Sequence, residues 1–86
     1  MNPKARKDDL VITKETGELY IEDIKNEIAI YLNPTSAYVW EKCDGERSTD
    51  DIAQEMENEL GMKISRKVVS MAVDKLSAKN LLVSAA

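Results

Sequence analysis

The sequence has no histidine and only one cysteine, Cys43, among its 86 residues. Histidine is the usual general base near neutral pH and the commonest metal ligand, so its absence removes the most frequent catalytic and metal-binding group. A single cysteine cannot form an internal disulfide. The sequence also lacks a phosphate-binding glycine loop, a nucleophile elbow and a paired-cysteine motif. We therefore expect a protein that is not an enzyme, with no catalytic residues, metal or cofactor.

Long apolar runs are also missing from the sequence. No stretch approaches the roughly 20 apolar residues that a membrane-spanning helix requires, and residues 1–7 lack the apolar segment of a secretion signal. There is no phenylalanine, one tryptophan and three tyrosines, so the core must consist mainly of aliphatic side chains. We expect a cytoplasmic protein with a flexible N-terminus over residues 1–9 and a single domain over residues 10–86.

Three short apolar segments cover residues 10–13, 18–22 and 28–32. Turn-forming residues, among them Gly17 and Asn26, separate them, and this order predicts an antiparallel β-meander. The third segment is apolar at nearly every position, which is typical of a strand covered on both faces. If it lies at a sheet edge, its free backbone groups can pair with an added strand. The alternatives are a protected edge and a homodimer formed through it.

A helix-start signal, Asn-Pro at residues 33–34, follows the third segment directly. It begins the first of three predicted helices, which cover about residues 34–42, 48–61 and 65–79. The last two resemble a helix-turn-helix. A short extended tail, residues 81–83, could return to the sheet. The predicted fold is therefore α+β and winged-helix-turn-helix-like, with a three-stranded meander before three helices.

The third predicted helix has more apolar surface than a core helix requires. Beside its core stripe, Val68, Met71, the aliphatic stem of Lys75 and Ala78 follow one another at helical spacing on a further face. Either a small domain covers its longest helix on two sides, or this second stripe is one wall of a groove for a partner.

Charge is distributed unevenly in a chain whose net charge is −4. Residues 41–60 contain eight acidic and two basic residues, whereas residues 61–86 contain five basic and one acidic residue. The basic part is either an ordinary solvated helix surface or a surface that attracts an acidic peptide. A winged-helix DNA-binding protein is an alternative, although the acidic second helix would lie near the phosphate backbone and repel it. A structural homodimer is a third possibility.

Residues 32–52, LNPTSAYVWEKCDGERSTDDI, resemble the PqqD family. The shared features are the Leu-Asn start followed by Thr/Ser and Ala, a tryptophan after an aliphatic residue, Cys-Asp-Gly, a hydroxyl cap and an acid–isoleucine pair. Weaker similarity extends over residues 10–83. The resemblance implies a recognition element for ribosomally synthesised and modified peptides (RiPPs), as in pyrroloquinoline quinone biosynthesis. Most of these residues have structural explanations, and we expect Cys43 to be a buried apolar residue rather than a nucleophile.

The resemblance also implies partners and a binding surface. In this family the leader of a precursor peptide adds as a strand beside the third strand, in the groove against the third helix, and the domain works with a radical SAM enzyme or another peptide-modifying enzyme. From the charge pattern and the short apolar runs we expect a monomer or weak homodimer, without nucleic acid or membrane as a partner. Carried onto this sequence, the peptide-binding residues would be Ile28, Ala29, Ile30, Tyr31, Leu32, Lys67, Val68, Met71, Lys75 and Ala78.

Overall fold

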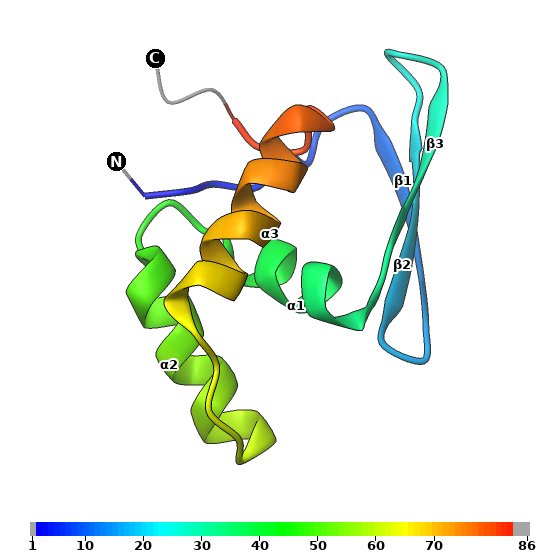
Figure 1. Ribbon diagram of the computed structural model, residues 1–86. Coiled ribbons are helices and arrows are strands. Elements are labelled where there is room, and N and C mark those ends of the chain that lie inside the picture. Colours follow the sequence, from blue (N-terminus) through cyan, green and yellow to red (C-terminus); the bar gives the residue numbers. More distant parts are fainter. Residues whose placement is uncertain (1, 84–86) are drawn as a thin grey trace.

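The computed structural model describes residues 2–83, which form three strands followed by three helices (Figure 1). The strands are β1 (Leu10–Glu15), β2 (Glu18–Asp23) and β3 (Ile28–Leu32), and the helices are α1 (Pro34–Lys42), α2 (Thr49–Leu60) and α3 (Arg66–Ala78). The strands form one antiparallel sheet in the order β1-β2-β3. The predicted α+β architecture, a meander before three helices, is confirmed.

Successive side chains of the sheet point to opposite faces. Ile21 of β2 pairs with Ile30 of β3, and both are buried, as is Leu32. On the other face Tyr20 pairs with Tyr31, and both side chains are exposed. Figure 1 shows the helices on one side of the sheet only. The apolar strand β3 therefore has one covered and one uncovered face, whereas its sequence is typical of a strand covered on both.

Local capping interactions determine where the helices begin. The Asn33 side chain accepts a hydrogen bond of 2.9 Å from the Ser36 backbone N–H at the start of α1. Ser48 and Asp51 form a capping box at the start of α2. Gly61 ends α2 with φ of 67°, a left-handed conformation that glycine adopts without steric cost. These boundaries agree with the predicted ones because caps depend on residues close together in the sequence.

The core lies between the sheet and α3, with α1 in the middle. α1 packs against α3 and against β2 and β3. The indole Nε1 of Trp40, on α1, donates a buried hydrogen bond of 2.8 Å to the Leu81 carbonyl. The remaining core is aliphatic, as the shortage of aromatic residues predicts. Its largest fully buried apolar side chains are Trp40, Leu19, Ile21, Ile52, Met56, Leu76, Leu81, Val39 and Val69.

Residues that precede β1 take part in the packing. Ala5 and Arg6 are buried. The Ala5 backbone N–H donates to the Cys43 carbonyl at 2.8 Å, and the Arg6 N–H donates to the Leu81 carbonyl at 2.9 Å. The packed unit therefore begins within residues 1–9, before the start of the predicted domain. A polar composition did not indicate this, because the contacts join segments that are distant in the sequence.

The segment after α3 does not return to the sheet, and that prediction is wrong. Leu82 instead forms an isolated antiparallel bridge with Ala5, and the Val83 N–H donates to the Lys4 carbonyl at 2.7 Å. The hydrogen bond from Trp40 holds the preceding residue, Leu81, at the helical side of the core. The end of the described chain therefore pairs with its beginning.

A buried ion pair joins the N-terminal segment to the sheet. The Arg6 guanidinium donates to both carboxylate oxygens of Asp23, at 2.9 and 3.1 Å. Asn26, in the turn between β2 and β3, donates to the same carboxylate through its backbone and its side chain. The hydrogen bonds from Arg6 and then from Asn26 hold the pKa of Asp23 well below its usual range. This charged cluster fixes the turn from which β3 begins.

Candidate functional site

The third strand lies at an edge of the sheet. The order β1-β2-β3 leaves one side of β3 without a strand partner in the part of the chain that the structure describes. Backbone N–H and C=O groups along such an edge can pair with an added strand. The condition that we set for strand addition, an edge position for residues 28–32, is therefore met.

A groove separates the end of β3 from the second half of α3. Its volume is about 600 Å³, which lies within the range of ligand-binding sites. The α3 helix packs against α1 and α2, and the residues near its C-terminal end face this groove. The lining residues are Tyr31, Leu32, Asn33, Ser36, Lys75, Leu76, Ala78 and Lys79.

Four of the ten predicted peptide-binding residues line this groove: Tyr31, Leu32, Lys75 and Ala78. The other strand residues precede them along the same edge. Ile28 and Ala29 are exposed, whereas the Ile30 side chain is buried in the core, so that only its backbone is available at the edge.

The other predicted helix residues lie in the first half of α3, outside the groove. Met71 precedes Lys75 by one helical turn, about 6 Å along the axis. The side chains of Val68 and Met71 are 44% and 51% exposed, and Lys67 is also exposed. The second apolar stripe of α3 is therefore not packed inside the domain. Lys75 and Ala78 of this stripe line the groove, whereas Val68 and Met71 do not.

Four lining residues escaped the sequence prediction: Asn33, Ser36, Leu76 and Lys79. Asn33 was interpreted only as a helix start, and Ser36 only as part of the stretch that resembles the family. One signal for them was available, because α1 follows β3 without a loop, and its first turn must therefore lie at the end of the strand. Lys79 lies one helical turn after Lys75, so helical spacing also places it on the same face.

The groove has a positive wall. The ammonium groups of Lys75 and Lys79 have no carboxylate within 4 Å among residues 2–83. By contrast, Arg66 at the start of α3 forms an ion pair with Asp50 at 3.3 Å. Positive charge without an acidic partner is therefore present at the end of α3 that lines the groove, and Lys67 is a further exposed lysine near the start of the helix.

The single thiol is not placed for nucleophilic chemistry. Cys43 is buried, as predicted, and its Sγ donates to the Val39 carbonyl at 3.1 Å. Burial raises the pKa of this thiol to about 11, so little thiolate forms near neutral pH. Among residues 2–83 no group of His, Cys, Asp and Glu is arranged to hold a metal ion.

None of the helices described is long and apolar enough to span a membrane.

These features define a class: a small α+β domain with an unpaired strand edge beside a groove, suited to binding an extended peptide. The model of the family described as "Coenzyme PQQ synthesis protein D (PqqD)" matches residues 18–82, most of the chain. The chain therefore belongs to the PqqD family, and the resemblance inferred from residues 32–52 is confirmed. Proteins of this family are peptide-binding partners of modifying enzymes.

Two solved structures share the fold over nearly the whole of both chains. One is described as TbiB1 in complex with the TbiA(beta) leader peptide; it has a TM-score of 0.73 and 17% identity and covers 96% of this chain and 98% of that one. The other is described as lasso peptide synthetase B1 complexed with the leader peptide, with a TM-score of 0.75, 16% identity and coverage of 98% and 100%. No curated protein sequence matches the chain.

Proposed function

We propose that this protein binds the leader segment of a ribosomally made precursor peptide and presents it to a peptide-modifying enzyme, of the radical SAM type or another. The observation that carries the proposal is the unpaired edge of β3 beside a groove of about 600 Å³. Membership of the PqqD family supports it. Both solved structures of similar fold contain proteins bound to leader peptides, which supports it further.

Strand addition beside β3 is the binding mode that this edge favours. The backbone groups of residues 28–32 can pair with an extended peptide whatever side chains the peptide carries. Specificity then comes from the side chains of the added strand, which alternate between the groove and the opposite face. Such an interface is small and transient, so we expect dissociation constants of about 0.1–10 μM.

The first half of α3 extends this surface past the end of β3. Val68 and Met71 offer exposed apolar area, and the flexible thioether of methionine adapts to different ligands. Lys67 lies beside them, and Lys75 and Lys79 supply positive charge at the groove. We therefore infer a leader segment in which an apolar stretch lies next to an acidic residue.

We infer that the domain itself catalyses nothing. The thiol of Cys43 is buried and its pKa is raised to about 11. The groove is lined by lysine, hydroxyl, amide and apolar side chains. The partner enzyme would supply any cofactor and the chemistry. Because this enzyme acts on a newly made peptide, the proposed location is the cytoplasm.

The test is an NMR titration of the isotope-labelled protein with short peptides selected for binding from a random display library. We expect amide shifts along residues 28–33 and 67–79. Shifts confined to α2 or to the outer strand β1 would overturn the proposed site. Failure of the library to yield any binder would count against the peptide-binding function itself.

Two methionines provide a matched pair of variants. Met71→Asp places a charge on the proposed surface, whereas Met62→Asp places the same charge on another exposed methionine, just after α2 and outside the groove. Both variants should fold, because both side chains are exposed. Loss of binding in Met71→Asp alone supports the site, and equal binding in the two variants contradicts it.

A further inference from the structure

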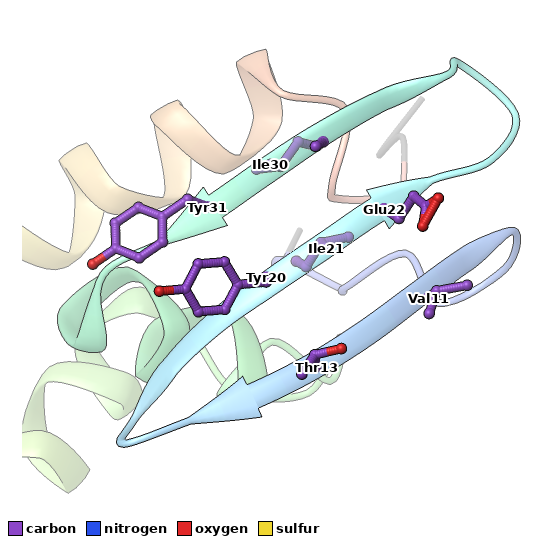
Figure 2. Close-up of a pocket in the computed structure, with 8 residues that line it drawn as sticks. Val11, Thr13, Tyr20, Ile21, Glu22, Ile30 and Tyr31 are labelled. Atoms are coloured by element: carbon purple, nitrogen blue, oxygen red, sulfur yellow. The ribbon is translucent and has the colours of Figure 1, made fainter.

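The face of the sheet that points away from the helices is a separate surface, which we call the sheet face (Figure 2). Its centre is a shallow pocket of about 340 Å³. The side chains of Val11, Tyr20 and Tyr31 are 48%, 44% and 50% exposed, although each is large and mainly apolar. Figure 2 shows the two tyrosine rings side by side, with their centroids 5.3 Å apart. Apolar groups gathered on one surface in this way mark a binding site more often than scattered ones do.

Three carboxylates border this apolar centre. The register places Glu15, Glu18 and Glu22 on the sheet face, and Glu15 lies directly opposite Glu18 across β1 and β2. Like charges opposite each other destabilise a sheet. No lysine or arginine nitrogen lies within 4 Å of these three carboxylates in residues 2–83. The one lysine of the strands, Lys14, has its side chain on the other face and pairs with Glu41.

From these observations we propose that the sheet face is a second docking surface, for a folded protein whose apolar contact area is bordered by arginine or lysine. Such a partner would cover the tyrosines and neutralise the three carboxylates, of which Glu18 accepts a hydrogen bond from the Tyr31 hydroxyl but has no basic partner among residues 2–83. A second copy of this chain fits poorly. In a symmetric pair through this face, Glu15, Glu18 and Glu22 would face the same three residues.

The sheet face and the groove meet at β3. Tyr31 lines both the groove and the pocket of the sheet face. A strand added beside β3 would extend the sheet, and its alternate side chains would emerge on the sheet face next to Tyr31. A partner docked there would contact the domain and the bound peptide together. The contact between the docked partner and the bound peptide rests on the proposed function, whereas the docking surface itself does not. Under the proposed function, the partner is the modifying enzyme.

The first experiment identifies the partner in the cells that produce the protein. A photo-crosslinking amino acid replaces Thr13, which lines the pocket, or, as a control, Gln54 on the exposed side of α2. We expect one protein other than this chain to be captured from position 13 and not from position 54. Capture of a second copy, or of nothing, at position 13 overturns the proposal.

The second experiment uses that partner in purified form. Wild-type protein, Glu22→Lys and Glu46→Lys are titrated with it by calorimetry; Glu46 is an exposed acid in the loop before α2, away from the sheet. We expect the affinity to fall at least tenfold in Glu22→Lys and to stay unchanged in Glu46→Lys. Equal affinity in all three proteins overturns the proposal, even if a partner was captured.

Peptide binding by the same variants separates this proposal from the proposed function. Glu22 lies on the central strand, away from the edge of β3, so Glu22→Lys should still bind the library-selected peptides. If Glu22→Lys loses partner docking and the wild-type protein binds no peptide, the proposed function is wrong and the docking surface is supported. If the protein binds peptides and Glu22→Lys binds the partner as tightly as the wild type does, the docking surface is wrong and the proposed function is supported.

Discussion

The two surfaces that meet at β3 differ in charge, although they share a strand. On the groove side, Lys75 and Lys79 have no acidic partner among residues 2–83, and on the sheet face Glu18 and Glu22 have no basic one. Both surfaces combine this charge with exposed apolar side chains. Tyr31 contributes to both. The difference teaches that one apolar edge strand can border two surfaces of opposite charge, because its neighbours on the two sides come from different elements.

The two surfaces also differ in what holds them in place. The groove has one wall from the sheet and another from α3, which the buried residues Val69 and Leu76 anchor in the core. The sheet face belongs to a single sheet of two hairpins. Substitutions in the core should therefore alter the groove first. Substitutions in the Arg6–Asp23 ion pair, which anchors the hairpins, should affect both surfaces.

The largest expected effect comes from breaking that common anchor. Asp23→Ala removes the hydrogen-bonding partner of Arg6 and of the Asn26 amide, leaving the buried guanidinium with only the exposed Asp8 carboxylate, 4.0 Å away. We expect the melting temperature to fall by roughly 10 °C or more, with loss of both surfaces. Thermal unfolding followed by circular dichroism measures the effect. An unchanged melting temperature would show that the pair does not anchor the hairpins.

The same carboxylate predicts a pH dependence. Because the pKa of Asp23 is lower in the folded protein than in an unfolded chain, its ionised form stabilises the fold above the unfolded value of about 4. This stabilisation is lost as the pH falls below that value. Denaturant unfolding from pH 7 to pH 2 should show the loss in the wild type. A wild-type profile that is as flat there as that of Asp23→Asn would contradict the assignment.

The next effect separates the two surfaces. Met71→Asp should weaken the binding of selected peptides by about tenfold or more, since a carboxylate would replace an apolar contact on the α3 stripe, a cost of about 1.4 kcal/mol. The same variant should bind the sheet-face partner as tightly as the wild type does when peptide is absent. Calorimetry with each ligand gives both numbers. If both affinities fall equally, the two surfaces are not independent.

Charge reversal in the groove should sharpen the contrast. The double variant Lys75→Glu, Lys79→Glu should weaken the binding of peptides that contain an acidic residue by several-fold to tenfold, with a larger effect at low ionic strength. Lys63→Glu, between α2 and α3, is the matched control, and it should have little effect. A new library selection against the double variant should yield basic peptides. The same acidic sequences from both proteins would exclude a role for these lysines in specificity.

The smallest effect concerns the sheet face alone. Glu15→Lys replaces the like-charge pair with Glu18 by an opposite-charge pair, so the melting temperature should rise by about 2–4 °C. The same substitution should weaken partner docking, and peptide binding should not change. Thermal unfolding measures the expected rise in melting temperature, and the docking titration measures the expected loss of affinity. A lower melting temperature would mean that the two carboxylates do not repel each other.

Part of the site could be predicted from sequence because helical and strand spacing is local. The stripe of Val68 and Met71 follows from residue spacing alone. Both side chains are exposed, and their role in binding stays a prediction. Asn33 and Ser36 were missed as groove residues, because their place depends on how α3 packs across α1. The conclusion that the bound partner is a peptide depends on family membership and on the open strand edge. Residue spacing alone does not predict it.

The sequence by itself determined the order of strands and helices, the caps that begin α1 and α2, and the family. These depend on contacts between residues a few positions apart. The tertiary structure alone decided that the segment around Ala5 pairs with Leu82, that Arg6 joins Asp23, and that one face of the sheet stays uncovered. Such features depend on contacts between segments that are distant in the sequence. Those contacts form only when the whole core packs, so local patterns in the sequence do not indicate them.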